Sequence, residues 1–336
     1  MNTGVFARSG AALGLDSEPF REDRRMAQSI HDFHDDPRNA DIRIWINGRL
    51  LPRAEATVSV FDSGFVLGDG VWEGLRVVQG QPVFLDEHLD RLFEGARAIA
   101  LDIGLDRRGL EDAIRETLAA NGMEDDVHLR LMVTRGIKRT PYQDPRASIG
   151  PATIVIIPEF KLPKPELLAR GLKLFTVHVR RGYPDVQDPR LNSHSKLNCI
   201  TACIQAINAG ADEALMLDPH GFVATCNSTH FFIVRRGEVW TSTGDYCLHG
   251  ITRAKVLQAC REAGIPCREK NFSLTDVYSA EEAFCTGTFA GVVAVREVDG
   301  RVIGDGRPGP MVARLQALYR ELVLRDVAVR AGERLA

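Results

Sequence analysis

Several features that mark particular classes of protein are missing from this sequence. No apolar run approaches the roughly 20 residues that span a bilayer, and residues 1–40 lack the basic and apolar stretches of a secretory signal. The formal net charge is −3, so electrostatics give no reason to expect a nucleic acid or an anionic membrane as a partner. We therefore predict a cytoplasmic protein whose partners are neither nucleic acids nor membranes.

Signatures of metal binding, nucleotide binding and serine hydrolysis are also missing. The seven cysteines are an odd number without a Cys-x-x-Cys pair, and no His-Glu-x-x-His motif occurs, so we predict neither a disulfide framework nor a metal site. Gly68-Asp69-Gly70 is too short a glycine pattern for a nucleotide loop and is typical of a tight turn. Ser193-His194-Ser195 lacks the flanking motif of a nucleophile elbow, which argues against a serine hydrolase.

The composition is that of a globular chain with room for two domains. Of the 336 residues, 44% are apolar and 26% are charged. Residues 1–40 are polar and include an acidic, histidine-rich stretch, so we interpret them as a flexible N-terminal extension with room for one short helix around residues 19–33. From Ile42 onward, alternating apolar residues followed by Asn47-Gly48 predict a β-hairpin and the start of ordered structure.

Two domains are predicted beyond the extension. A helix through residues 89–99 capped by Asp86, a second over about 108–120, and strands at 127–134 and 152–157 indicate a small α+β domain, residues 41–157. Three prolines mark residues 158–165 as an interdomain linker. In the larger domain, residues 166–336, we predict strands at 172–178, 213–217, 222–225, 230–234, 282–286 and 292–296, and helices at 196–208, 252–263 and from about 309.

Seven separate segments make chemical sense only when they are considered together. A phosphorylated pyridine cofactor needs an amine that forms an imine, donors for its phosphate and a group beside its ring nitrogen. The segments follow in order between about Ile44 and Tyr319, and they are Val58–Phe65, Gly68–Arg76, Phe84–Leu92, Ser195–Asn198, Gly250–Arg253, Thr286–Thr288 and Gly304–Pro310. In them the sequence resembles the class IV aminotransferases, the family of branched-chain and D-amino-acid aminotransferases.

That resemblance implies a fold, a cofactor and partners. The expected fold is the mixed α/β, two-domain architecture of fold type IV enzymes, with the small domain covering the larger, cofactor-binding one. The expected cofactor is pyridoxal 5'-phosphate, and the expected assembly is a homodimer with each active site at the domain interface. The partners are then a small-molecule amino donor and a 2-oxo acid.

The resemblance also implies which residues bind the cofactor covalently and hold its phosphate. Lys196 stands at the Schiff-base position of the family, where the amine bonds to the cofactor and then moves a proton between the substrate Cα and the cofactor. Burial is expected to lower the pKa of this lysine toward neutrality. Arg91 matches the arginine that binds the phosphate, and it follows His88 by three residues on one helix face.

Two backbone segments are expected to complete the phosphate site. Gly250, Ile251 and Thr252 stand before a helix whose free N–H groups point at an anion, and the hydroxyl of Thr252 adds a donor. Gly287 and Thr288 match the second phosphate loop of the family, which also contacts the substrate carboxylate.

The substrate pocket is expected to be lined by Trp72, Arg76, His128, Arg130 and Phe289. His128 and Arg130 are two residues apart on a predicted strand and therefore face the same side. The stretch from Trp72 to Arg76, together with Arg130, is closest to the branched-chain subgroup. That subgroup, however, usually has phenylalanine in place of Trp72, tyrosine in place of His128 and a further tyrosine near Leu67.

The largest departure from the family pattern is Thr225. The family places a glutamate here, which keeps the pyridine nitrogen protonated, and an asparagine five residues later, where this chain has His230. A neutral hydroxyl cannot stabilise a pyridinium as a carboxylate does, so the electron sink is expected to be weaker. Thr225 is thus compatible with an altered transaminase or with a different reaction on the same fold.

The favoured activity is a ping-pong transamination from an L-branched-chain amino acid to a 2-oxo acid such as 2-oxoglutarate. Transamination of D-amino acids or (R)-amines is the first alternative. A lyase of the aminodeoxychorismate type is the second, and it would release pyruvate without needing a keto-acid acceptor. A cofactor-binding module without catalysis is the non-enzymatic alternative, and a purified protein that stays colourless with added pyridoxal phosphate would favour it.

Overall fold

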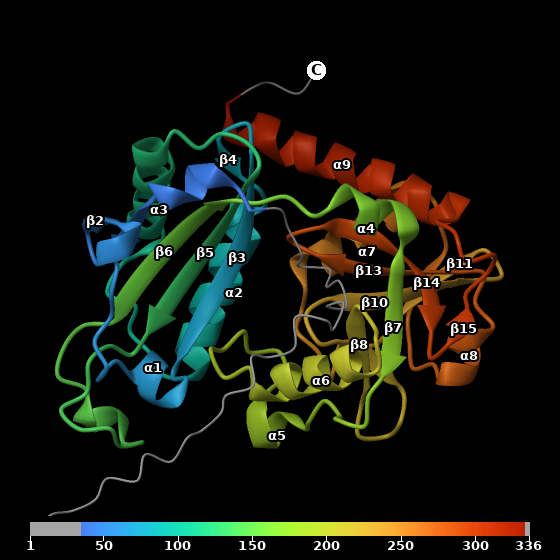
Figure 1. Ribbon diagram of the computed structural model, residues 1–336, viewed down its shortest axis with the longest axis horizontal. Coiled ribbons are helices and arrows are strands. Elements are labelled where there is room, and N and C mark those ends of the chain that lie inside the picture. The colour runs from blue at the N-terminus through green and yellow to red at the C-terminus, as the bar shows by residue number, and fades with distance from the viewer. Residues whose placement is uncertain (1–34, 333–336) are drawn as a thin grey trace, which may run out of the picture.

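The structure, a computed structural model, describes residues 35–332, and its secondary structure is built around two β-sheets (Figure 1). The predicted helix around residues 19–33 lies outside the described residues. Within them, no helix is long and apolar enough to cross a membrane.

The small sheet has six antiparallel strands in the order β2-β1-β6-β5-β3-β4. Its strands are β1 (Arg43–Ile46), β2 (Arg49–Pro52), β3 (Gly70–Val78), β4 (Gln81–Pro82), β5 (Val127–Thr134) and β6 (Thr153–Phe160). Helices α2 (Leu85–Ala98) and α3 (Arg107–Asn121) cover one face, and their apolar side chains form a core with Leu75, Leu129 and Leu131 (Figure 1). The opposite face carries the alternate residues of β3 and β5 and is free of this core.

The large sheet has nine strands, eight of them in the order β12-β11-β10-β13-β14-β7-β8-β9, with β15 paired to β14. Its strands are β7 (Leu172–Thr176), β8 (Glu213–Leu217), β9 (Val223–Cys226), β10 (His230–Arg235), β11 (Glu238–Thr241), β12 (Cys267–Glu269), β13 (Glu282–Gly287), β14 (Gly291–Val298) and β15 (Arg301–Val302). Two cores lie on its two faces, one with Leu215, Phe231 and Cys285, the other with Phe232 and Phe284.

The longer helices of the large sheet fix the positions of the candidate site residues. Helix α6 (Leu197–Asn208) packs on β8, while α7 (Ile251–Glu262) and α9 (Pro310–Arg330) pack together over β13 and β14 (Figure 1). The short helical elements are η1 (Pro37–Ala40), η2 (Arg53–Glu55), α1 (Ser63–Leu67), η3 (Pro145–Ala147), α4 (Pro165–Arg170), α5 (Pro184–Gln187) and α8 (Leu274–Tyr278).

Three predictions about elements need correction. Asp86 does not cap α2, because the helix begins at Leu85 and its N-cap residue is Phe84 in a left-handed conformation. Strand β6 continues to Phe160 and so enters the range predicted as linker, because Pro158 faces Leu129 in the ladder and needs no N–H there. Strand β3 has no counterpart among the predicted strands, since it is buried on both faces for much of its length and shows no clear alternation.

Candidate active site

Lys196 lies where the two sheets meet. The chain just before it, Asn192–Ser195, runs antiparallel to the start of β3, with Ser193 bridged to Val71. Trp72 N donates to Asn192 O at 3.0 Å, and His194 N donates to Gly70 O at 2.9 Å. Lys196 then becomes the N-cap residue of α6. A lysine on the large-sheet side is therefore fixed to the small sheet by backbone hydrogen bonds.

The side chain of Lys196 is half-buried and its pKa is lowered to about 8. Burial is the main cause, and the positive charges of Arg181 and Arg91 act in the same direction. Cys199 and Glu73 oppose the shift. At a pH slightly above neutrality, a useful fraction of this amine is therefore unprotonated and able to act as a nucleophile or a base.

Arg91 belongs to a buried ion-pair cluster around Glu73. Arg91 donates to the two carboxylate oxygens of Glu73 at 2.8 and 2.6 Å, and His88 Nδ1 lies 2.7 Å from Glu73 Oε2. Burial alone would raise the pKa of Glu73, but the charge of Arg91 and the hydrogen bonds from His88 and Arg91 outweigh it and lower the pKa to about 2. Glu73 is thus ionised, and it holds the guanidinium in one orientation.

The same guanidinium reaches the start of α7. Arg91 Nη1 donates to His249 O at 2.9 Å, one residue before Gly250. Three of the five guanidinium N–H groups are therefore engaged, and the remaining ones can bind an anion bidentately. Sequence spacing predicted that His88 and Arg91 share a helix face, and both side chains do meet one carboxylate.

The N-terminus of α7 has the features of an anion site. No side chain caps it at Gly250, so the first N–H groups of the helix, at Ile251 and Thr252, remain available. A Cβ on Gly250 would lie 2.2 Å from Cε1 of His230, so only glycine fits between this ring and the loop. The hydroxyl of Thr252 forms a side-chain hydrogen bond with Tyr319 of α9.

The ring of His230 packs against the segment Leu248–Gly250, just before α7. The ring is buried, and its Nε2 lies 2.6 Å from Leu248 O, so Nε2 carries the proton and donates. Burial lowers the pKa of His230 to about 3, which keeps the ring neutral. In the sequence, His230 stands out only because the family has an asparagine at this position. Its role in shaping the loop follows from its contact with Gly250.

Gly287 and Thr288 end β13 next to the same histidine. His230 pairs across the ladder with Thr286, whose buried hydroxyl lacks a hydrogen-bond partner within residues 35–332. A Cβ on Gly287 would lie 3.2 Å from Thr229 Cγ2, so this turn packs tightly against the β9–β10 connection. The two predicted phosphate segments, from α7 and from β13, are therefore neighbours through His230.

Thr225 lies buried on β9, beside this connection. Its hydroxyl donates to Thr229 O at 2.7 Å. The single proton of the hydroxyl is therefore engaged, and the oxygen can only accept a further hydrogen bond. In this arrangement the hydroxyl is not free to donate to a pyridine nitrogen.

The predicted substrate residues of β3 and β5 share the face of the small sheet that α2 and α3 leave uncovered. Trp72, Arg76, His128 and Arg130 alternate along the two paired strands. The guanidinium of Arg130 lies 4.0 Å from the Trp72 ring centre, and Lys196 Nζ lies 5.5 Å from a ring centre of the same indole. The ring of Phe289, from the large sheet, meets His128 edge-on at 5.8 Å.

These contacts link most of the sequence-predicted positions, and Arg76 and Thr225 are not among the residues that they join. On one side of Lys196, Phe289 contacts His128, and Arg130 contacts the indole of Trp72, which faces the lysine. On the other side, hydrogen bonds connect Lys196 through Asn192 and Glu73 to Arg91 and the start of α7. Glu73 and Asn192 were missed as site residues. Glu73 lies inside one of the matching segments, which is a usable signal, but nothing in the sequence marks Asn192.

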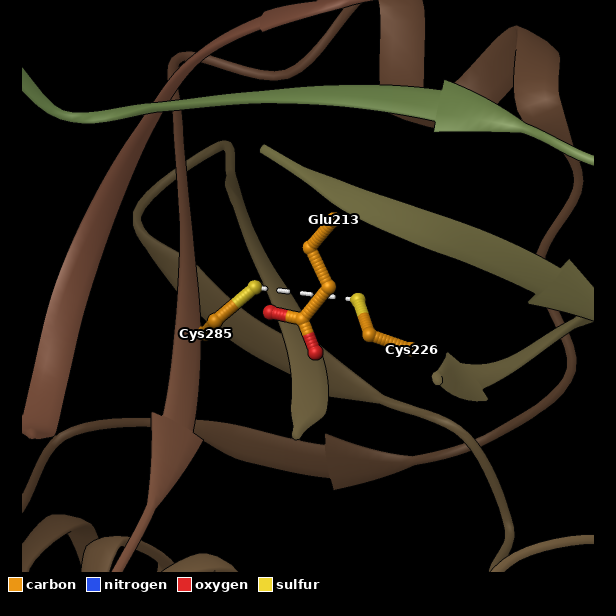
Figure 2. A group of neighbouring side chains, drawn as sticks. All are labelled: Glu213, Cys226 and Cys285. Carbon is orange, nitrogen blue, oxygen red and sulfur yellow. Dashed lines mark hydrogen bonds between the residues drawn. The ribbon is translucent and has the colours of Figure 1, made fainter. Parts of the chain in front are cut away.

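A second cluster of reactive side chains lies in the core of the large sheet (Figure 2). Glu213, Cys226 and Cys285 are buried, with ligand-type atoms within 4.8 Å of one another, and the two thiols are 3.7 Å apart. The Glu213 oxygens already accept hydrogen bonds from Ser228 and Thr229, and burial raises the pKa of Cys226 well above its usual value. Two thiols in contact and a carboxyl that already accepts hydrogen bonds form a packed polar cluster of the core.

Comparison with known proteins gives consistent matches. The family model described as "Amino-transferase class IV" matches residues 70–298. Branched-chain-amino-acid aminotransferase-like protein 1 of Arabidopsis thaliana is 41% identical over 286 residues, which are 85% of this chain and 51% of that protein. The chain thus spans about half the length of this relative.

A shorter relative is matched over nearly its full length. The putative branched-chain-amino-acid aminotransferase of Methanocaldococcus jannaschii is 40% identical over 84% of this chain and 96% of that protein. Among solved structures, the branched-chain aminotransferase of the thermophilic archaeon Thermoproteus uzoniensis, solved with norvaline, has a TM-score of 0.77 at 31% identity, covering 85% of this chain and 96% of that one.

Proposed function

We propose that this chain, which belongs to the class IV aminotransferase family, is a transaminase that uses pyridoxal 5'-phosphate to move the amino group of an L-branched-chain amino acid to a 2-oxo acid such as 2-oxoglutarate, in a ping-pong reaction. The observation that carries this proposal is the amine of Lys196, with a pKa lowered to about 8, between an anion cradle and an aromatic wall. The names of the relatives support the branched-chain substrate.

The residues around Lys196 fit the cofactor. The start of α7, where Gly250 supplies no side-chain cap, and the two spare donors of Arg91 form a cradle for a phosphate dianion, completed by Gly287 and Thr288. Bound there, pyridoxal phosphate supplies an aldehyde that bonds to amines and a ring that withdraws electrons from the substrate Cα.

Lys196 has two tasks in this proposal. Its Nζ would be the amine that holds the cofactor covalently, and the free amine would be the base that takes up and returns the proton of the substrate Cα. A pKa of about 8 suits both tasks because the amine exchanges protons readily near neutral pH. Asn192 and the indole of Trp72 keep water away from one side of it.

Thr225 modifies the reaction rather than the binding of the cofactor. With its proton donated to Thr229 O, the hydroxyl offers an uncharged acceptor to the pyridine nitrogen in place of a carboxylate. A pyridine ring held beside this hydroxyl would be a weaker electron sink than one paired with a carboxylate. This is the main reason to test the direction and the substrate of the reaction directly.

Charged and aromatic residues of the small sheet are proposed to select the substrate. Arg130 and Arg76 offer positive charge to carboxylates, while Trp72 and Phe289 form an apolar wall that suits a branched aliphatic side chain. The His128 ring lies beside Gly74 and against Phe289. It would narrow the space for the substrate between the arginines and the aromatic side chains.

The assembly belongs to the proposal as well. We take residues 41–157 and 166–336 as two domains that form one active site at their interface, and we take the enzyme to be a homodimer. Support for a partner surface comes from α6, where Leu197, Ile200, Ile204 and Ile207 are each at least half exposed.

The test is an anaerobic half-reaction screen on the purified protein loaded with pyridoxal phosphate. L-leucine, L-glutamate, D-alanine and (R)-1-phenylethylamine are added separately while the visible absorbance of the cofactor is followed. We expect L-leucine and L-glutamate to bleach it and the other two to have no effect. Bleaching by D-alanine or the (R)-amine would instead assign the enzyme to those substrate classes.

The screen has a built-in control and a negative outcome of its own. A Lys196→Ala variant should bind pyridoxal phosphate more weakly and bleach with none of the donors. If the wild-type protein binds the cofactor but no donor bleaches it, the transaminase proposal fails. Release of pyruvate from an amino-substituted chorismate-like substrate without an added 2-oxo acid would then identify a lyase.

A further inference from the structure

Asn192 makes an unusual set of contacts for a residue in a connecting segment. Its side chain is buried, and its backbone and amide both bind the same residue of β3. Trp72 N donates to Asn192 O at 3.0 Å, and Asn192 Nδ2 donates to Trp72 O at 2.6 Å. Trp72 Nε1 also donates to Ser193 O at 3.1 Å. Both the backbone and the indole of Trp72 therefore hold this segment to the small sheet.

The hydrogen bonds determine how the Asn192 amide is oriented. Its nitrogen faces two acceptors, Trp72 O and, at 3.5 Å, Glu73 Oε1. Its oxygen faces a donor, Lys196 Nζ, at 3.1 Å. A flipped amide would place the oxygen against two acceptors and the –NH₂ group against the lysine, so only the observed orientation satisfies all partners.

We propose that Asn192 is the positioning residue of Lys196 and holds Nζ near the N-terminal end of β3. Its amide also connects Nζ to the Glu73 carboxylate, which orients Arg91. The proposal rests on the assigned role of Lys196 as the reactive amine. It adds that the amine and the phosphate-binding guanidinium keep a fixed spacing, because Lys196 is hydrogen-bonded to Asn192 and Arg91 to Glu73, while the Asn192 amide is hydrogen-bonded to Trp72 O, next to Glu73 in β3.

Two effects on Lys196 follow from this arrangement. The carbonyl oxygen of the amide accepts a hydrogen bond from the ammonium and stabilises the charged form, and it also limits the rotamers of a long and flexible side chain. The charged or titratable groups that act on Lys196 from the surrounding elements are Arg181, Arg91, Glu73 and Cys199. Asn192 is the neutral group that touches Nζ directly, so its replacement changes the amine without changing any of those four charges.

The test measures the ionisation of Lys196 in the absence of cofactor. The full-length protein is freed of any bound aldehyde by dialysis against hydroxylamine and labelled with a trace of acetic anhydride between pH 6 and 10, and the Lys196 peptide is quantified by mass spectrometry. The wild-type midpoint is expected at about 8. In Asn192→Ala it should fall by about half a pH unit to one unit, because an acceptor for the ammonium is lost.

Asn192→Asp tests the acceptor function of the amide separately from its donor function. It keeps an acceptor next to Nζ and makes it anionic, so the labelling midpoint should rise above that of Asn192→Ala and toward or beyond the wild-type value. In the loaded enzyme, Asn192→Ala should lower kcat with the best donor about ten- to hundredfold while KM changes less than about twofold, because the misplaced group is the base.

Ser195→Ala is the matched control. It removes the hydrogen bond from Ser195 Oγ to Gly68 O, in the same segment, without touching Nζ, and it should leave the Lys196 midpoint unchanged. A wild-type midpoint in Asn192→Ala, or equal shifts in the alanine and aspartate variants, would overturn the proposal. If the protein binds no pyridoxal phosphate, the proposed function is refuted. The labelling needs no cofactor, so it would still test the role of Asn192 in that case.

Discussion

Glu213 (Figure 2) lies buried at the start of β8. Its carboxyl accepts hydrogen bonds from Ser228 and Thr229. Burial raises its pKa from 4.5 to about 7, although those hydrogen bonds oppose the shift. Between about pH 4.5 and 7 the folded protein therefore binds a proton that the unfolded chain has lost. The contribution of Glu213 to stability is largest below this window and declines by about 3 kcal/mol as the pH rises through it.

We accordingly predict that Glu213→Gln removes this decline. The amide keeps an oxygen that accepts from Ser228 and stays neutral at every pH, so the variant should be more stable than the wild type at pH 8 and nearly equal at pH 5. Urea unfolding of the cofactor-free protein at pH 5, 6, 7 and 8 measures the difference. Glu55→Gln, at an exposed glutamate, is the control, and a Glu213→Gln curve that parallels the wild type at all four values would refute the assignment.

Individual site residues could be predicted from the sequence only where a motif surrounds them. Lys196, Arg91 and the segment 250–252 each have matching neighbours in the chain, and the structure brings them into one region. Asn192 has no such signal, because its importance comes from contact with Trp72 and Glu73, which precede it by 120 and 119 residues. The engaged proton of Thr225 likewise depends on the turn that brings Thr229 O within 2.7 Å.

At the scale of elements, the last helix anchors the helix that carries Arg91. Asp326 of α9 accepts the backbone N–H of Phe84 at 2.7 Å, and the Phe84 ring packs into the core between α7 and α9, near Tyr319. Helix α2 begins at the next residue, so α9 sets where α2 starts and where His88 and Arg91 lie. The anchor is part-buried, so leaving the N–H without an acceptor should cost about 1–3 kcal/mol.

Asp326→Ala should therefore lower the free energy of unfolding by that amount and also weaken cofactor binding. Because Arg91 contacts the phosphate in our proposal, the loss should be greater for pyridoxal phosphate than for pyridoxal. Urea unfolding and absorbance titrations with both aldehydes measure the two effects. Arg325→Ala, on the same helix as Asp326, breaks an exposed ion pair with Glu262 of α7 and should change stability by no more than about 0.5 kcal/mol. Equal losses for the two aldehydes would contradict the link from α9 to Arg91.

Element boundaries were predicted well where the signals are local and poorly where the partner is distant. Helix α3 runs from Arg107 to Asn121, close to the predicted 108–120, because Asp106 caps it and Gly122 ends it in a left-handed conformation. The start of α2 was misjudged because Phe84, not Asp86, is its N-cap residue and the N–H of Phe84 is satisfied by Asp326, 242 residues away. A local capping rule has no access to such a partner.

At the scale of the whole molecule, the exposed apolar side chains of α6 predict a surface between two copies of the chain. Leu197, Ile200, Ile204 and Ile207 recur at helical spacing on a helix that begins directly after Lys196 (Figure 1). Exposed apolar side chains so spaced are typical of an interface, and in a symmetric dimer the same patch of both subunits would meet. Ile204→Glu would bury an unpaired carboxylate there, which costs several kcal/mol, so we predict a monomer at micromolar concentration.

Leu324→Glu is the matched control, because Leu324 is about as exposed as Ile204 and lies on α9, well away from α6 (Figure 1). Light scattering coupled to size exclusion should give a dimer for the wild type and Leu324→Glu and a monomer for Ile204→Glu. Since α6 starts at the reactive lysine, the monomer should also lose most of its transaminase activity while keeping its fold by circular dichroism. A wild type that is monomeric and fully active would show instead that one chain completes the site, leaving the α6 stripe without a part in catalysis.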